Sequence, residues 1–111
     1  MPYFDWDEEK NQKLISEREI SFEEVVDMIE SGGLLDVIDN PNQKKYKGQK
    51  MYVVEINNYI YIIPFVENET KVFLKTIFPS RKATKKYLKE RGEIKWNTMM
   101  FQWANLQKYV K

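Results

Sequence analysis

Alternating apolar and polar positions in the middle of the chain predict an antiparallel sheet. Met51 to Ile56 and Tyr59 to Val66 are two β-type runs, and Asn57-Asn58 between them is a two-residue turn that tolerates positive φ at both positions. Lys71 to Phe78 alternates in the same way and predicts a third strand. Because Tyr59 to Ile63 has no polar face, this run is expected to be the central strand, covered on both sides.

Two helices with clear start signals precede these strands. The first is expected to begin after Asp7, whose carboxylate can accept hydrogen bonds from the free amides of the first turn, and to end near Glu19. Ser21 and Glu24 form a capping box for the second helix, and Gly32-Gly33 supplies its left-handed stop. The apolar face that this helix would pack on the sheet consists of Phe22, Val25, Val26 and Ile29.

Shorter elements are expected on either side of this framework. Tyr3 to Asp7 is aromatic and alternating, as in an edge strand. Leu34 to Ile38 predicts another strand, which is followed by a lysine-rich loop at Gln43 to Gln49. After the sheet, Ser80 suits the N-cap of a basic helix over residues 81–92.

The C-terminal residues 93–111 predict an amphipathic helix, because large apolar side chains recur at spacings of three and four. The members of this stripe are Trp96, Met99, Trp103, Leu106 and Val110. The stripe would either pack on the domain's own sheet or form an interface with a second copy of the chain or with another protein. The predicted fold class is therefore a small α+β domain over residues 1–92, with an antiparallel sheet of about four to five strands packed against N-terminal helices, followed by this extension.

Composition limits the kind of protein further. A chain of 111 residues with 42% hydrophobic content can form one core. It has no cysteine for a disulfide or a thiolate metal site, and no apolar run approaches the roughly 18 residues of a membrane span. No glycine-rich phosphate loop or metal-ligand cluster is present, so no cofactor or metal is expected. We expect a cytoplasmic protein with no membrane association.

The net charge of +1 hides a strong asymmetry along the chain. Residues 1–40 carry 12 acidic and 3 basic side chains, a net charge of −9, whereas residues 41–111 carry 15 basic and 5 acidic ones, a net charge of +10. Two interpretations follow. The halves fold against each other and partly neutralise, or the basic half presents a surface to a polyanion.

Three segments, in this order and spacing, carry a resemblance to a known family. They are Phe4-Asp5-Trp6-Asp7-Glu8-Glu9-Lys10-Asn11, Ile20-Ser21-Phe22-Glu23-Glu24-Val25 and Ser80-Arg81-Lys82-Ala83-Thr84. Together they resemble the BrnT family, which are toxins of bacterial type II toxin-antitoxin modules. The resemblance implies a fold similar to RelE-like ribonucleases, RNA cleavage that arrests growth, and a DNA-binding antitoxin as partner.

The chain departs from the family's pattern at three places. Glu17-Arg18-Glu19 stands where the family commonly has Lys-His-Gly, and the chain has no histidine at all. Thr76 stands at a common arginine, with Lys75 one residue away, which in a strand is the opposite face. Tyr87 stands at a common glutamate.

RNA cleavage by internal transfer needs a cation for the phosphorane charge and groups that move protons. The resemblance and the residue types leave Arg18, Lys75 and Arg81 as cations, with Lys82 as a further one. Tyr87, by its type alone, is the candidate for proton transfer, and Tyr52 is another. A tyrosine, lysine or glutamate in this role would need a shifted pKa.

Arg81 has an additional argument, because free amides in the first turn of its helix would point at an anion such as a phosphate. The alternative for Arg81 is an ion pair with the acidic half. The other lysines of this helix are candidate RNA-binding residues or a solvated face, and with Lys82 they are Lys85, Lys86 and Lys89.

Two function classes therefore remain after the sequence. The first is an endoribonuclease toxin that an antitoxin holds inactive. The second is a non-catalytic binding module that keeps the fold and the partner surface but has lost RNA cleavage. The absent histidine favours the second class, whereas the basic segment from Ser80 to Thr84 favours the first.

Overall fold

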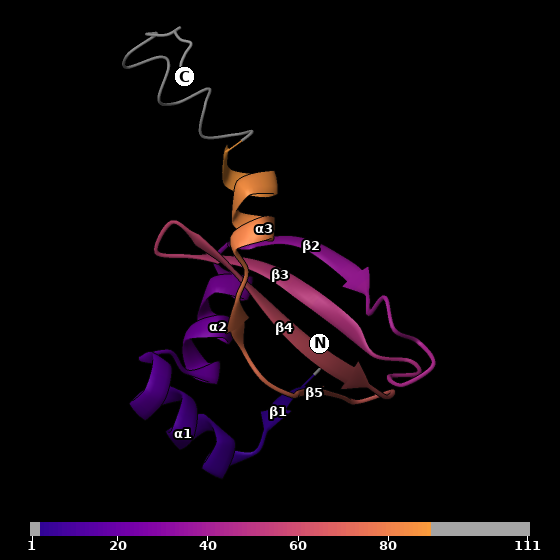
Figure 1. Ribbon diagram of the computed structural model, residues 1–111. Helices are drawn as coiled ribbons and strands as arrows, with labels where there is room; N and C mark the ends of the chain where they lie inside the picture. The colour runs from indigo at the N-terminus through magenta and orange to yellow at the C-terminus, as the bar shows by residue number, and fades with distance from the viewer. Residues whose placement is uncertain (1–2, 90–111) are drawn as a thin grey trace, which may run out of the picture. The chain divides into compact units, whose positions relative to one another are not determined.

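A six-stranded sheet organises the part of the chain that the structure describes. The computed structural model describes residues 3–89 (Figure 1). The strands lie in the order β1-β5-β4-β3-β2, and β6 pairs with β4. Their bounds are β1 Tyr3–Trp6, β2 Leu34–Asp39, β3 Lys50–Ile56, β4 Tyr59–Glu67, β5 Lys71–Leu74 and β6 Phe78–Pro79. The fold class is α+β, as predicted.

The β3–β4 hairpin confirms the local prediction in detail. Asn57 and Asn58 both have positive φ, 54° and 64°, and they connect the paired residues Ile56 and Tyr59. These are the values of a turn whose twist matches that of the two strands. Strand β4 is the middle strand of the sheet, and it is covered on both faces, since Ile60 has no exposed surface and neither has Ile63.

The sheet is mixed, so the prediction of a wholly antiparallel sheet is wrong at one edge. Strand β1 pairs in parallel with β5, with Tyr3 opposite Lys71 and Trp6 opposite Leu74. A short hairpin loop forces antiparallel pairing, but most of the chain separates β1 from β5, and such a connection permits either direction. Local sequence patterns therefore could not predict whether β1 pairs with β5 in the parallel or the antiparallel direction.

The predicted strand from Lys71 to Phe78 is interrupted, which raises the strand number to six. Strand β5 ends at Leu74, opposite Phe65, and the next residue donates its amide to the Pro64 carbonyl at 2.8 Å. Pro64 has no N–H to return. The hydrogen-bonded ladder between β4 and β5 stops at this proline. Beyond it, the predicted alternation of inward and outward side chains is not kept: Ile77 is buried, whereas Phe78 is 37% exposed.

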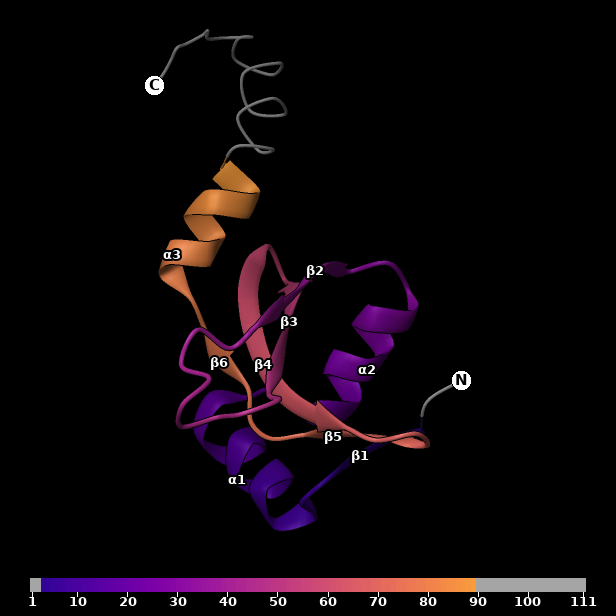
Figure 2. The same cartoon turned by 90° about the vertical axis from the view of Figure 1, so that its right-hand side faces the viewer.

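Helices α1 (Glu8–Arg18) and α2 (Phe22–Glu30) precede β2 in the chain, and α2 packs on the sheet (Figures 1 and 2). Their caps are those predicted. The Asp7 carboxylate accepts the amides of the first turn of α1, and Ser21 with Glu24 forms the complete capping box of α2. After α2, Gly32 has a φ of 102°, and the Gly33 amide donates to the Met28 carbonyl at 2.6 Å.

The core lies between these helices and one face of the sheet. It contains Leu14, Ile20, Phe22 and Val25 from the helical segment, and Tyr52, Val54, Ile56, Ile63, Phe65, Val72, Leu74 and Ile77 from the sheet region. Phe4 and Trp6 of β1 pack against this cluster, and the Trp6 ring stacks on Phe22 with centroids 5.6 Å apart. The edge strand expected at Tyr3 to Asp7 is therefore present, and two of its aromatic side chains contact the core.

The chain after Ser80 belongs to a second unit, and the division falls between Met1–Ser80 and Arg81–Lys111. Helix α3 (Arg81–Thr84) begins at the predicted residue and continues as a π-helical segment, η1 (Lys85–Lys89). The predicted helix end and domain boundary at residue 92 lie outside the described residues. The same holds for the predicted amphipathic stripe, which is Trp96, Met99, Trp103, Leu106 and Val110.

Candidate functional site

Arg18 links the end of α1 to the connection between β5 and β6. Helix α1 ends after Arg18 because Glu19 adopts a left-handed conformation, with a φ of 57°. From this position the Arg18 Nη1 donates a hydrogen bond of 2.6 Å to the carbonyl of Ile77. The Ile77 side chain is fully buried, so the acceptor is held by the core. Arg18 as a whole residue remains exposed.

Lys75 is the second candidate cation in this part of the molecule. It is exposed, and its ammonium lies 5.5 Å from the centroid of the Phe73 ring. Lys75 stands two residues before Ile77, the partner of Arg18. Strand β5 ends at Leu74, so Lys75 and Thr76 lie after the strand. The argument that a strand would place these two side chains on opposite faces therefore does not apply to them. The fold thus brings two candidate cations to one connection.

The remaining candidates lie in the second unit. Arg81 and Lys82 belong to α3, and Lys85 and Lys86 belong to η1; all four are exposed. Within η1, the Lys86 ammonium lies 5.4 Å from the centroid of the Tyr87 ring, and the Tyr87 side chain is half-buried.

Helix α3 has four residues of α-helix and continues without a break into η1, so Arg81 lies in the first turn of a helix as predicted, and a phosphate contact there stays a prediction. Lys89 is the last residue of η1, and its side chain lies outside the described part of the structure.

Tyr52 does not have the environment of a proton-transfer group. Its ring is buried, stacks on Phe65 with centroids 4.0 Å apart, and meets Phe4 edge-on at 6.3 Å. Burial raises the pKa of the Tyr52 phenol, and the negative charge of Glu67 raises it further. A general base or acid works best with a pKa near the operating pH, so Tyr52 is better explained as part of the core.

Glu8 also has a perturbed pKa, in the opposite direction. Gln12 donates a hydrogen bond of 2.8 Å to its carboxylate, and the Trp6 indole donates one of 3.2 Å. These two bonds lower the pKa of Glu8, with Gln12 as the larger cause. Since the carboxylate is stabilised in its ionised form, Glu8 is unsuited to donate a proton.

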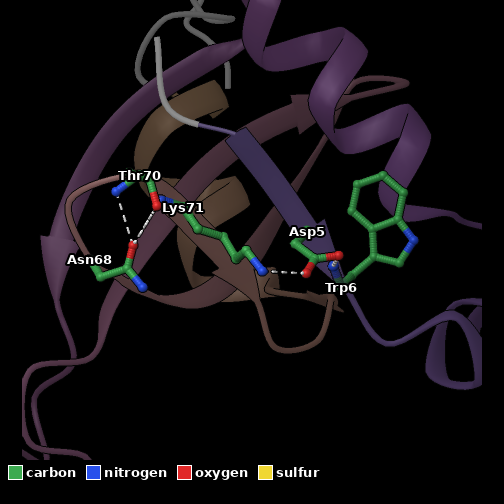
Figure 3. Close-up of polar contacts among 5 residues, drawn as sticks. All are labelled: Asp5, Trp6, Asn68, Thr70 and Lys71. Carbon is green, nitrogen blue, oxygen red and sulfur yellow. Dashed lines mark hydrogen bonds and ion pairs between the residues drawn. The ribbon is translucent and has the colours of Figure 1, made fainter.

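An ion pair between Asp5 and Lys71 joins the acidic and basic parts of the chain. The Lys71 ammonium lies 3.3 Å from a carboxylate oxygen of Asp5 (Figure 3). Beside it, the side-chain oxygen of Asn68 accepts the backbone amides of Thr70 and Lys71, which fixes the turn that leads into β5 (Figure 3). This pair supports the interpretation that the two halves neutralise each other, at this point of the sheet.

Two features that were given no functional or structural role from the sequence become prominent in the structure. Asn11 is fully buried between α1 and α2, and the loop between β2 and β3 exposes Lys44, Lys45 and Lys47 around Tyr46. The signal for the loop was present in the sequence, as an aromatic residue among three lysines. The signal for Asn11 was not, because its partners become visible only in the folded chain.

Comparison of the chain with family models, with curated proteins and with solved structures finds no match. Among residues 3–89, no group of three acidic, histidine or cysteine side chains is arranged to hold a metal ion. None of the helices in the described part of the chain combines the length and the apolar character that crossing a membrane requires.

Proposed function

We propose that this chain is a BrnT-like toxin of a type II toxin-antitoxin module, a RelE-like endoribonuclease whose RNA cleavage arrests growth. In this proposal an antitoxin of the DNA-binding type holds the protein inactive until the antitoxin is lost. The observation that carries the proposal is the hydrogen bond between Arg18 and the Ile77 carbonyl, at 2.6 Å. It fixes the cation that remains in the altered Glu17-Arg18-Glu19 segment to the β5–β6 connection, the segment that also contains Lys75.

Arg18 and Lys75 are the two cations of this connection that we assign to a phosphate that gains charge during the reaction. Arg18 uses one N–H on a fixed backbone carbonyl, so its remaining donors are held in a defined direction, and a preorganised cation stabilises developing charge without a reorganisation cost. Lys75 adds a second, more adjustable positive charge. The Ser80 amide is bonded to the Ile60 carbonyl of β4 at 2.9 Å, which fixes the chain up to the residue before Arg81.

The element order also supports the proposed fold. An N-terminal strand, two capped helices and a strand meander occur in that order, and the resemblance to the BrnT family implies a small α+β domain. Several residues that carry the resemblance have structural roles here. Asp7 caps α1, Asn11 holds α2, and Ser21 with Glu24 caps α2. These residues therefore support the family's fold more than its chemistry.

The test is growth arrest together with cleavage of RNA by the purified protein. Expression without any partner should arrest growth, and Arg18→Ala, Lys75→Ala and Arg81→Ala should each lower the cleavage rate by about 100-fold or more. Arg81→Lys should recover little if the contact is bidentate, because an ammonium cannot reproduce the guanidinium fork. Lys13→Ala is the matched control, since it removes an exposed cation from α1 and should leave the rate unchanged.

Circular dichroism and the melting temperature must stay close to those of the parent for these results to concern catalysis. If the variants fold normally and still arrest growth, their cations are not catalytic.

The alternative function is a non-catalytic binding module with the same fold and partner surface. The observation that favours it is the absence of histidine from the chain, together with the burial of Tyr52 and the raised pKa of its phenol. These leave Tyr87 and the lysines as the groups that would have to move protons. A parent protein that neither arrests growth nor cleaves RNA when expressed alone would establish this alternative as the better account.

A further inference from the structure

The loop between β2 and β3 carries a run of cations that the proposed catalytic group does not use. Residues 41–48 are all exposed, and they include Lys44, Lys45 and Lys47 with Tyr46 among them. Exposed Lys50 follows at the start of β3, and the sequence between Asp39 and Glu55 contains no acidic residue. In Figure 1 this loop projects beyond the ends of β2 and β3, on the side opposite the Asn57-Asn58 turn. It is a locally positive surface with one aromatic ring.

The side chain of Gln43 fixes the shape of this loop. Its amide nitrogen donates to the carbonyls of Asn40, at 2.6 Å, and of Gln49, at 3.2 Å. Its amide oxygen accepts the N–H of Gly48, at 3.0 Å. One side chain therefore closes the loop with three hydrogen bonds. Gly48 has a φ of 75°, a conformation that glycine adopts at little cost.

A second set of hydrogen bonds holds the backbone beneath the lysines and the tyrosine. The side-chain oxygen of Asn42 accepts the Lys45 amide at 3.1 Å, and the backbone carbonyl of Asn42 accepts the Tyr46 amide at 2.9 Å. The Tyr46 carbonyl in turn accepts the amide of buried Gln49, at 3.0 Å. The Lys45 ammonium lies over the Tyr46 ring, 5.3 Å from its centroid, and Tyr46 is 38% exposed, so a cation and a partly exposed aromatic ring lie together on an ordered backbone.

We propose that the loop formed by residues 43–50 binds single-stranded RNA, with its lysines on phosphates and the Tyr46 ring stacked on a base. Cations that follow a nucleic-acid backbone and an aromatic ring that stacks on a base are the usual combination for single strands. A duplex hides its base faces, so Tyr46 would have no stacking partner on one. Because the loop is already ordered by side-chain hydrogen bonds, binding costs it little conformational entropy.

This inference rests on the proposed function for the identity of the ligand as RNA, and it adds the surface that holds the substrate away from the reacting phosphate. The exposed acidic side chains of α1 and α2 would repel the same strand, which favours an approach over the loop. The lysines have another explanation, in which they only keep the protein soluble. In that case their position on the loop should not matter for binding.

The experiment measures the affinity of the full chain for a short, fluorescently labelled 2′-O-methyl oligoribonucleotide by anisotropy at several salt concentrations. The methyl groups block the 2′-hydroxyl, so binding is measured without cleavage. Lys44→Gln/Lys45→Gln should weaken binding about 10-fold and reduce the slope of log affinity against log salt by about 1.4, the share of two phosphate contacts on a single strand. Lys10→Gln/Lys13→Gln removes the same charge from α1 and should bind like the parent.

Two further variants separate stacking and loop order from charge. Tyr46→Ala should weaken binding by about 5- to 150-fold, whereas Tyr46→Phe should bind like the parent, because the stacking surface is retained. Gln43→Ala keeps every charge but removes the three hydrogen bonds that close the loop, and it should weaken binding several-fold with an unchanged melting temperature of the domain.

Equal effects of the two double variants, or parent-like binding by Tyr46→Ala, would overturn the proposal. So would a parent that does not bind the oligonucleotide even at low salt. Cleavage of unmodified RNA by the parent is measured in parallel. If the parent does not cleave but the loop variants lose binding, the enzyme proposal fails and the loop proposal stands. If the parent cleaves and the loop variants bind normally, only the loop proposal fails.

Discussion

At the scale of single residues, Asn11 holds two helices together. Its side-chain oxygen accepts the Phe22 amide at 2.8 Å, and its nitrogen donates to the Glu23 carboxylate at 2.8 Å. The Phe22 amide belongs to the first turn of α2, where backbone donors have no partner inside the helix. Asn11 is fully buried, so the bond that it accepts from Phe22 is protected from water.

Asn11→Ala should destabilise the domain by about 2–3 kcal/mol, because the Phe22 amide would be left buried without an acceptor. The measurement is the free energy of unfolding in urea. Gln12→Ala is the matched control: Gln12 is exposed and bonds to Glu8, so its loss should cost less than about 0.5 kcal/mol. Similar effects of the two substitutions would show that the hydrogen bonds of Asn11 do not hold α1 and α2 together.

The raised pKa of the Tyr52 phenol predicts that the folded protein loses stability in alkaline solution. Its pKa is raised in the folded protein, so above pH about 10, where the phenol of an unfolded chain ionises, the unfolded state loses its proton first. Stability should be unaffected below this pH and should fall as the pH rises toward the folded pKa.

Tyr52→Phe removes the titrating group and retains the ring that stacks on Phe65. Its melting temperature should therefore fall less between pH 9 and pH 11 than that of the parent, with both pH values chosen to bracket the ordinary tyrosine pKa of about 10. Tyr59→Phe serves as the comparison, because Tyr59 is a half-buried tyrosine next to the hairpin turn. Parallel melting curves for parent and Tyr52→Phe would argue against this role.

At the scale of elements, the turn of the β3–β4 hairpin sets the register of the central strands. Ile56 lies opposite Tyr59 and Lys50 opposite Phe65, and each of these pairs depends on two residues with positive φ, Asn57 and Asn58. A slip by one residue would turn Ile63 and Phe65, which belong to the core cluster, to the opposite face of the sheet. The local geometry of two asparagines thus fixes which side chains enter the core.

Asn58→Gly should therefore raise stability by a few tenths of a kcal/mol to about 1 kcal/mol, since glycine adopts positive φ without steric cost. Asn58→Val should lower it by about 1–2 kcal/mol, because a β-branched side chain is strained in this conformation. Thermal unfolding of the two variants gives the comparison. Equal stability of the valine and glycine variants would mean that the turn does not need its positive φ.

At the scale of the whole molecule, the charge asymmetry is partly explained by contacts and partly left on the surface. Asp5 and Lys71 pair across the β1–β5 edge, whereas the acidic side chains of α1 and α2 are exposed. The lysines of the β2–β3 loop are exposed as well. Neutralisation at the sheet and a separate basic surface therefore coexist, and the two interpretations from the sequence are not exclusive.

The predicted stripe in residues 93–111 can be tested on the same scale by deleting these residues. If the stripe is an interface, the shortened protein should keep the parent's circular dichroism and melting temperature but lose self-association or binding of a partner. Light scattering measures the mass with and without the segment. Loss of folding would instead indicate that the apolar side chains of this segment pack on their own domain.

The sequence by itself determined the features that depend on neighbouring residues. Asp7 and Ser21 predicted the starts of α1 and α2. Asn57-Asn58 predicted the turn of the hairpin, and the apolar run of β4 predicted the central strand. Each of these signals works through bonds within a few residues or through side-chain periodicity, so the chain carries it locally. For the candidate site, the sequence supplied the residue types, including Arg18 and Lys75.

Only the tertiary structure decided how distant segments meet. The parallel direction of β1, the break after Leu74 opposite Pro64, and the bond from Arg18 to Ile77 each involve partners far apart in the chain. The burial of Asn11 and Tyr52 likewise depends on what packs over them. A local pattern specifies which groups are available, but the chain must close long loops before their partners are fixed, and the energy of the whole core decides which closure is adopted.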